Sequence, residues 1–401
     1  MRKIILFSAM LLCGFGMAIA NPATMDKVAK ISKLSERPPK AQIVRVAVVR
    51  DSRELLLSID GSYTIRDGNT GAQLDKGKRL VRSKMRLLDK GILVGMNVYP
   101  VKCLIIVPLR EATIVINGHE FRGKIRLIRT PDNRMTAIND LNIEDYVKGV
   151  LYHEMPHRWP MEALKTQAVA TRTYAISSIS PKKDYDMTND IYSQVYGGKK
   201  AEHYRTGLAV DRTAGQVLAY KGKLLPAFFH SDCGGMTEDA KEVWDTDLLP
   251  LKGVPCSFCS TSPHMHWKVN LRLKEIQDVL NRQGHKMGAI KDIAIVDRNK
   301  SDRINNLKFT GRDGQELIIK GKDFRDMMGP NLIKSNNYDI TMKGYFADFN
   351  GKGWGHGVGM CQWGTYGMSR QQFTYDQILK YYYPHVDIMD YHALQANKPA
   401  K

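Results

Sequence analysis

The most reactive group of side chains in this sequence is His153-Glu154-Met155-Pro156-His157. These residues fit the H-E-x-x-H pattern, in which two histidines on one helix face bind zinc and the glutamate activates the bound water. Pro156 opposes that interpretation, because a proline disfavours helical conformation in the residue before it and removes a hydrogen bond inside a helix. We therefore predict an elbow between two helices, and keep a zinc hydrolase as an alternative.

Glu154 is the candidate general acid of this elbow. It is expected near the C-terminal end of a helix, where the helix dipole disfavours a carboxylate, and Met155 and Trp159 could exclude water from it. Both effects raise the pKa of a carboxyl group, as a proton donor at neutral pH requires. Lys165 or Arg172 could instead lower the pKa of Glu154 or bind an anionic substrate. The alternative is an exposed helix-terminal glutamate without a role.

A second candidate site is the glycine-rich block at residues 351–367, which reads GKGWGHGVGMCQWGTYG. Its alternating glycines indicate either a strand that another segment approaches closely or a tight loop. The block fits neither the dinucleotide-binding pattern nor the P-loop. His356, Gln362 and the tryptophans Trp354 and Trp363 could line a sugar-binding cleft, with a purely structural glycine hairpin as the alternative.

The cysteines could hold a metal ion or form a disulfide. Cys256 and Cys259 have C-x-x-C spacing, with Cys233 before them and His264 or His266 after them, which resembles a set of zinc ligands. In an oxidising compartment a disulfide competes with that interpretation. We expect a structural role for Cys233, Cys256 and Cys259 in either case, and no cofactor that catalysis requires.

Two helical patterns must position the elbow. Apolar residues at helical spacing follow Asn142, which is a plausible N-cap, and Pro156 stops this first helix. Pro160 suits the first position of the second helix. Further helices are expected over residues 200–212, 272–283 and 374–383.

The region before the elbow is β-rich. Residues 43–138 contain short runs of apolar and β-branched residues separated by turn signals such as Asn117-Gly118. We predict an α+β fold in which this region is joined to a mixed catalytic region, residues 139–388, that carries the helix–elbow–helix. The remaining segments are a signal peptide at 1–20, a flexible lead-in at 21–42 and a tail at 389–401.

Charge and the first residues indicate where the protein acts. The chain of 401 residues has a formal net charge of +19, which implies an anionic partner such as nucleic acid, a membrane surface or a cell-wall polymer. Residues 1–20 combine two basic residues, an apolar run and a small-residue ending, as in a cleavable signal peptide. We therefore expect an exported protein, periplasmic or associated with the cell wall, with no nucleic-acid partner and no stable membrane span after cleavage.

Three separated motifs resemble one known family. They are NIEDYVKGVLYHEMPHRWPMEALKTQAVATRTYA, the segment FFHSDCGGMTEDAKEVW, and GWGHGVGMCQWGTYGM followed by ILKYYYP. In this order they resemble the stage II sporulation protein D and amidase enhancer LytB family, over residues 43–388. The resemblance implies a lytic transglycosylase that cuts peptidoglycan glycan strands, preferably strands without stem peptides. It implies Glu154 as the catalytic residue, and Lys165, Arg172 and His356 match family positions that support activity.

The implied chemistry requires one carboxyl group. Glu154 would protonate the glycosidic oxygen between N-acetylmuramic acid and N-acetylglucosamine, then take the proton of the muramyl C6 hydroxyl as a 1,6-anhydro ring closes. A hydrolase would normally need a second carboxyl group at a defined separation. The candidate substrate-binding residues are Gln167, Tyr174, Ser231, Trp354 and Gln362.

Some expectations depart from the family pattern. Some members bind zinc through one His and two Cys before Q-V-Y-G, but Met187 and Ser193 stand at the cysteine positions here, so that zinc site is not carried over. The cleavable N-terminus means that a sporulation role is not implied. The alternative function is a non-catalytic peptidoglycan-binding enhancer of a partner N-acetylmuramoyl-L-alanine amidase. We also expect Arg172 and His356 to lie in the same cleft as Glu154.

Overall fold

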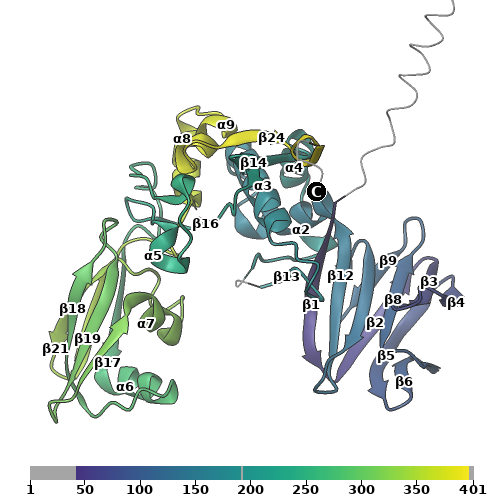
Figure 1. The fold of residues 1–401 in the computed structure, drawn as a ribbon, viewed down its shortest axis with the longest axis horizontal. Coiled ribbons are helices and arrows are strands. Elements are labelled where there is room, and N and C mark those ends of the chain that lie inside the picture. The colour runs from purple at the N-terminus through teal and green to yellow at the C-terminus, as the bar shows by residue number, and fades with distance from the viewer. Residues whose placement is uncertain (1–41, 191–192, 397–401) are drawn as a thin grey trace, which may run out of the picture. The chain divides into compact units, whose positions relative to one another are not determined.

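The computed structural model describes residues 42–190 and 193–396 (Figure 1). The expected signal peptide and residues 21–41 of the expected lead-in lie outside the described residues. The described chain mixes helices with strands and begins with a β-rich region, so the predicted α+β class is confirmed. Within these ranges, no helix is both long enough and apolar enough to cross a membrane.

The N-terminal region consists of two sheets. Their strands alternate between buried and more exposed residues, so that each sheet turns one apolar face toward the core. In β2 (Glu54–Asp60), for example, Leu55, Leu57 and Ile59 are buried in the shared core. One sheet has the order β13 (Met187–Thr188), β1 (Ile43–Ser52), β12 (Met135–Asn142), β11 (Lys124–Arg129), β8 (Cys103–Pro108), β3 (Tyr63–Asp67), β4 (Gln73–Gly77). The other has the order β10 (His119–Phe121), β9 (Thr113–Ile116), β2, β5 (Leu80–Leu88), β6 (Gly91–Val94), β7 (Asn97–Tyr99).

The helical part begins where β12 ends. The predicted N-cap is confirmed, since the Asn142 side chain accepts a hydrogen bond from the Glu144 N–H at 2.8 Å at the start of α2 (Ile143–Glu154). The second helix, α3 (Met161–Ser177), buries most of its residues. Pro160 takes the N-cap position of α3 rather than the predicted first helical position, a shift of one residue.

Of the other elements in this part, α3 contacts α2, α4, α8, α9 and β14. The remaining elements are η1 (Lys199–Ala201), α4 (Tyr204–Arg212), β14 (Gln216–Tyr220), β15 (Lys223–Leu224), β16 (Phe229–His230), α5 (Ala240–Trp244), η2 (Leu249–Leu251), β23 (Met360–Cys361), α8 (Gln362–Arg370), α9 (Tyr375–Tyr382), β24 (Asp387–Asp390) and α10 (Tyr391–Ala396). For residues 389–396 the expectation of a tail was wrong, because β24 pairs with β14 and α10 buries Leu394, and residues 397–401 lie outside the described residues.

A second hydrophobic core is formed by residues between Trp267 and Phe349, a stretch of the chain that lies between β16 and β23. Its amphipathic helix α6 (Leu273–Arg282), expected over 272–283, buries Leu273, Ile276 and Leu280. The other elements are β17 (Trp267–Arg272), β18 (Ile290–Arg298), β19 (Ile304–Gly311), β20 (Glu316–Lys320), α7 (Gly321–Met328), β21 (Tyr338–Lys343) and β22 (Phe346–Gly351).

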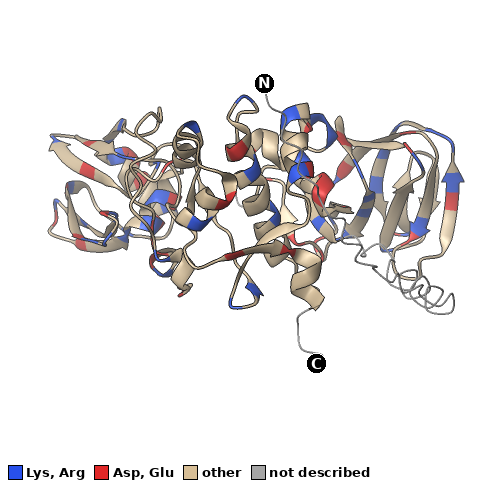
Figure 2. Ribbon diagram, turned by 90° about the horizontal axis from the view of Figure 1, so that it is seen from above, with Lys and Arg blue, Asp and Glu red and all other residues tan. Residues whose placement is uncertain are grey.

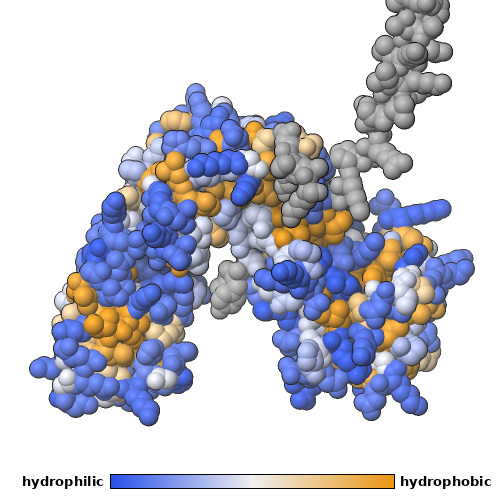
Figure 3. All heavy atoms as spheres, in the orientation of Figure 1, coloured by the Kyte–Doolittle hydropathy of each residue, from blue (hydrophilic) through white to orange (hydrophobic). Residues whose placement is uncertain are grey.

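The surface carries charges of both signs. Lys and Arg residues are distributed over the N-terminal sheets, the helical part and the second core, with Asp and Glu residues between them (Figure 2). Most of the face seen in Figure 3 is hydrophilic, with several apolar patches between the hydrophilic areas. Among the apolar side chains, those of Val296 in β18 and Ile318 in β20 are more than half exposed. The positive charge is therefore spread widely rather than gathered in one described groove.

Candidate functional site

The predicted break after the first helix is confirmed. α2 ends at Glu154, and Met155 already has an extended backbone with φ −136° and ψ 138°. His153 and His157 therefore do not share the face of one helix, which the zinc-protease pattern requires. The ring of His157 instead stacks on that of His203, with 4.1 Å between the ring centroids.

Contacts from two directions hold the elbow in place. Arg205 of α4 donates hydrogen bonds to the carbonyl oxygens of His157 at 2.9 Å and Trp159 at 3.1 Å. The Trp159 ring packs against Trp363 and Tyr366 of α8, with centroid distances of 5.0 and 4.8 Å. These contacts fix the chain directly after α2, and with it the last residue of that helix.

The half-buried carboxyl group of Glu154 is bound by neutral groups. Its Oε2 accepts a hydrogen bond from Gln362 Nε2 at 3.2 Å, and its Oε1 accepts one from the Val195 N–H at 3.4 Å. The same Gln362 nitrogen donates to Gln167 Oε1 at 3.2 Å, and Gln167 donates to the Thr171 hydroxyl at 3.0 Å. The structure thus brings two predicted substrate-binding residues, Gln362 and Gln167, to Glu154.

Burial raises the pKa of Glu154 above its ordinary value. The hydrogen bonds from Gln362 and the Val195 N–H act in the opposite direction, because they favour the carboxylate, but loss of water is the largest effect. Lys165 and Arg172, which could have lowered this pKa, each bind other partners. Glu154 therefore keeps its proton to a higher pH than an exposed glutamate does.

Val195 was missed by the sequence reasoning, because a backbone N–H leaves no signal in the residue type. Its segment is held along α2: Tyr146 donates to Gln194 Oε1 at 2.9 Å, and the Gly197 N–H donates to the Gly149 carbonyl at 3.0 Å. A side chain at Gly149 would lie 2.5 Å from the Tyr196 ring, so glycine is needed for this close packing.

Arg172 does not lie beside Glu154, so the expectation that they share a cleft was wrong. The fully buried guanidinium forms a bidentate ion pair with the Glu144 carboxylate, with distances of 2.8 and 2.6 Å. It also donates hydrogen bonds to the carbonyl oxygens of Gln216 at 3.1 Å and Val210 at 3.4 Å. Glu144 lies in the first turn of α2 and Glu154 is its last residue, about 15 Å farther along at 1.5 Å per residue. Arg172 joins α2, α3, α4 and β14.

Lys165 is also used in packing. Its Nζ lies 2.7 Å from Glu162 Oε1 and 4.9 Å from the centre of the Tyr375 ring. Glu162 Oε2 in turn accepts from the Tyr375 N–H at 2.9 Å, at the start of α9. Lys165 thus helps attach α9 to α3, and no described contact joins it to Glu154.

His356 lies among aromatic rings. The ring centroids of Trp244 and Phe228 are 4.8 and 6.4 Å from that of His356, and Phe228 is 5.9 Å from Tyr174 of α3. Burial, aided by the positive charge of Arg325, lowers the pKa of His356 to about 3. The imidazole is therefore neutral at neutral pH. Its connection to α3 runs through Phe228 and Tyr174, and a shared cleft with Glu154 stays a prediction.

The other predicted binding residues hold the glycine block in place. The Trp354 backbone pairs with Asp232, and its ring contacts His264 at 4.4 Å and Lys334 at 5.2 Å. The Ser231 carbonyl accepts from the Trp363 N–H at 3.0 Å, at the start of α8. Ser231 acts through its backbone in this contact, and Trp354 acts through both its backbone and its ring.

The glycine block is a tight loop rather than a strand. Gly353, Gly355, Gly357 and Gly359 all have positive φ, between 71° and 116°. A side chain at Gly359 would overlap the carbonyl oxygen of Phe228, so the loop needs glycine to approach that segment. The loop ends in β23, which pairs with β16, and delivers Gln362 to Glu154.

Four cysteines meet in one buried cluster. Cys233, Cys256 and Cys259, the predicted ligands, are joined by Cys361, and their sulfur atoms all lie within 4.8 Å of one another. Cys361 was missed because it stands in the glycine block, far from the C-x-x-C pair. The cysteines are free thiols, and His264 packs against Trp354 instead.

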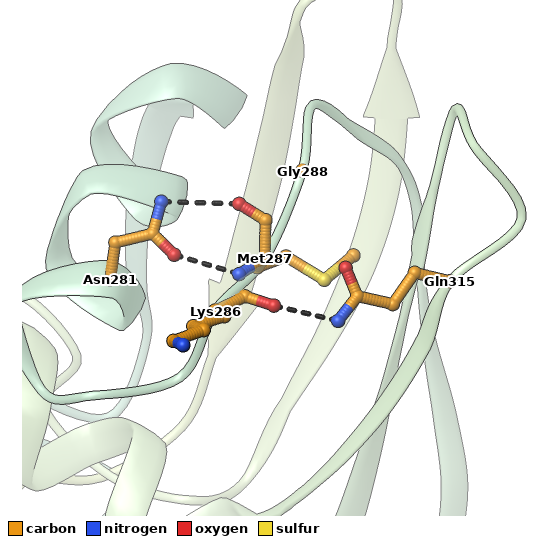
Figure 4. Close-up of a pocket in the computed structure, with 5 residues that line it drawn as sticks. All are labelled: Asn281, Lys286, Met287, Gly288 and Gln315. Atoms are coloured by element: carbon orange, nitrogen blue, oxygen red, sulfur yellow. Dashed lines mark hydrogen bonds between the residues drawn. The ribbon is translucent and has the colours of Figure 1, made fainter.

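Two cavities lie near the second core. One, about 390 Å³, is lined by Asn281, Lys286, Met287, Gly288 and Gln315 (Figure 4). The side-chain amides of Asn281 and Gln315 form hydrogen bonds with the backbone of Met287 and Lys286, respectively. This cavity contains none of the predicted site residues. The other, about 300 Å³, is lined by polar residues that include Glu238, Arg303 and His356.

Comparison with known proteins agrees with the motifs. The family described as Stage II sporulation protein matches residues 131–220, which include the elbow, and a domain family of unknown function matches residues 258–359. An uncharacterized protein of Brachyspira hyodysenteriae is 41% identical over 69% of this chain and 74% of its own length. Stage II sporulation protein D of Bacillus amyloliquefaciens is 29% identical over 63% of this chain and 76% of its length.

A further relative is the amidase enhancer of Bacillus subtilis, which is 28% identical over 61% of this chain and 40% of its own length. The matched family model covers α2, the elbow and α3, where the Glu154 carboxyl group is held. The chain belongs to the stage II sporulation protein D and amidase enhancer family.

Proposed function

We propose that this protein is an exported lytic transglycosylase that cuts peptidoglycan glycan strands. Membership of this family supports a function related to the cell wall. The observation that carries the finer proposal is the single carboxyl group of Glu154, whose pKa is raised by burial and whose described partners are neutral. A group of this kind can give a proton at neutral pH and take one back.

The reaction needs Glu154 twice. As an acid, it protonates the oxygen that links muramic acid C1 to the next glucosamine, and the C1–O bond breaks. As a carboxylate, it then removes the proton of the C6 hydroxyl while O6 bonds to C1, which closes the 1,6-anhydro ring. The proton returns to Glu154, so no water is consumed and no second carboxyl group is required.

Gln362 is placed to stabilise the Glu154 carboxylate that acts in the second step. Its amide nitrogen binds Glu154 Oε2 and Gln167 Oε1, which holds the carboxyl group at the start of α8. A hydrogen-bond donor stabilises the carboxylate that remains after the first proton transfer. The ring series from Tyr174 through Phe228 to the exposed Trp244 offers flat apolar surfaces on which sugar rings can stack.

Gln362→Met should move the alkaline limb of the kcat/KM–pH profile to higher pH. Methionine removes the donor that lowers the pKa of Glu154 but still excludes water, so the active protonated acid persists to higher pH. Gln371→Met, at the exposed end of α8, is the matched control and should leave the limb in place. A shift of the limb to lower pH in Gln362→Met would contradict this role.

The decisive experiment uses purified residues 21–401 and glycan strands stripped of stem peptides, with mass spectrometry of the products. We expect 1,6-anhydromuramyl ends, lost in Glu154→Gln, and slower cutting of strands that keep their peptides. Ordinary reducing ends would establish a hydrolase instead. Strand binding without cutting, together with stimulation of an added amidase, would favour the enhancer role suggested by one relative's name. Peptide release that stops on addition of chelator would favour a zinc hydrolase.

A further inference from the structure

The cluster of four cysteines is assembled from three distant parts of the chain. Cys233 follows β16, Cys256 and Cys259 lie in the loop after η2, and Cys361 ends β23. All four side chains are buried, and every sulfur atom lies within 4.8 Å of every other. Two disulfides would need only two close pairs of sulfur atoms, whereas one ion needs all four sulfur atoms around one point.

The spacing of the sulfur atoms fits a metal. Cys233 Sγ and Cys259 Sγ are 3.6 Å apart. Zinc bound to four thiolates at about 2.3 Å places neighbouring sulfur atoms about 3.8 Å apart at the corners of a tetrahedron. A disulfide bond is only about 2.05 Å long. The Cys256-x-x-Cys259 pair is also a usual spacing for two ligands of one zinc ion.

The surroundings of the cluster suit charged thiolates. The backbone N–H groups of Cys233 and Gly364 both donate to Cys361 Sγ at 3.3 Å, and the Tyr382 hydroxyl lies 3.2 Å from Cys256 Sγ. Donors around the ligands stabilise their negative charge and fix their orientation. A side chain at Gly364 would overlap the Tyr382 hydroxyl and lie 2.8 Å from Cys256 Sγ, so glycine keeps this shell close.

We propose that Cys233, Cys256, Cys259 and Cys361 bind one structural zinc ion. Four protein ligands leave no open position, as in zinc sites that stabilise a fold rather than catalyse a reaction. The ion would fasten the start of α8 to the loops that carry the other three ligands.

The site also has a consequence for Glu154, which rests on the proposed function. Cys361 is the N-cap of α8, and the next residue, Gln362, binds the Glu154 carboxyl group. The metal would therefore act as a positioning element for Gln362. Its loss should disturb the pH profile of cleavage as well as stability.

Metal analysis of the purified mature protein tests the site without any activity assay. We expect about one zinc per chain, retained in Cys103→Ser, whose thiol lies in β8 outside the cluster, and lost in Cys361→Ser. Cys259→His, which keeps a ligand at the same position, should retain the metal where Cys259→Ala loses it. After exchange with cobalt, wild type should show the strong absorption of tetrahedral cobalt thiolate, altered in Cys259→His.

Two results would overturn the proposal. One is metal-free protein, purified without chelator, in which peptide mapping finds these cysteines joined as disulfides. The other is iron in place of zinc in protein from cells supplied with both metals. Because these results do not depend on cleavage, a failure of the zinc site and a failure of the transglycosylase proposal are told apart. If the wild-type protein holds zinc but Cys259→Ala, which has lost it, cuts strands with an unchanged pH profile, only the positioning role would be overturned.

Discussion

Glu154→Gln should slow the cutting of glycan strands by about 10³-fold or more, because one side chain both gives and takes the proton. The substitution keeps the length of the side chain and its contacts with Gln362 and Val195. The initial rate of strand cleavage by matched amounts of protein measures the effect. Glu54→Gln, at a partly exposed position on β2, is the control and should cut at the wild-type rate. A Glu154→Gln enzyme with more than a tenth of wild-type activity would contradict the acid–base role.

A measurement of unfolding stability distinguishes the loss of cleavage in Glu154→Gln from misfolding of the variant. The pKa of Glu154 is raised in the folded protein above the 4.5 of an ordinary glutamate, so the fold binds its proton more tightly than the unfolded chain does. The stability that comes from the protonated group is present below pH 4.5 and is lost as pH rises through the folded pKa. Glu154→Gln should thus be at least as stable as wild type at pH 7, and its advantage should disappear below pH 4.5. Urea unfolding at both pH values measures this.

Arg172→Met should lower the free energy of unfolding by about 3 kcal/mol, because it removes the charged partner of the Glu144 carboxylate, which keeps only a hydrogen bond from the Gly215 N–H among the described contacts, and one donor to each of two carbonyl groups. The value lies at the low end of the range for broken buried pairs, since the Glu144 side chain is 26% exposed. Urea unfolding followed by circular dichroism measures the change. Activity per folded molecule should change far less than in Glu154→Gln.

Lys165→Met is the matched control on the same helix. Its ion pair with Glu162 is partly exposed, so we expect a loss below about 1 kcal/mol. If Arg172→Met kept full stability but lost cleavage, the guanidinium would have to act on the substrate, and the structural role assigned to Arg172 would be wrong.

Local signals in the sequence predicted the framework of the site. The Asn142 cap, the helical spacing after it and the break at Pro156 depend on neighbouring residues, and α2 and the elbow follow them. The α3 boundary differed by one residue at Pro160. The direction of the pKa shift of Glu154 was left open by the sequence, because Lys165 or Arg172 could have lowered it, and the structure shows that burial raises it.

Contacts between distant segments could not be derived in this way. Gln362 and Cys361 reach their partners only after the chain has passed through the whole second core, and no periodicity encodes that meeting. The sequence offered Lys165 and Arg172 as neighbours of Glu154 or of an anionic substrate but could not say which residues of other elements pack against them. Arg172 consequently faces Glu144 rather than a substrate.

The most direct test of the central claim is cleavage of stripped glycan strands in water enriched in heavy oxygen, with mass spectrometry of the new ends. The account predicts anhydromuramyl ends that carry no heavy oxygen, because the C6 hydroxyl of the sugar attacks C1 and Glu154 only moves protons. New reducing ends labelled with heavy oxygen would contradict it, since water would then be the nucleophile.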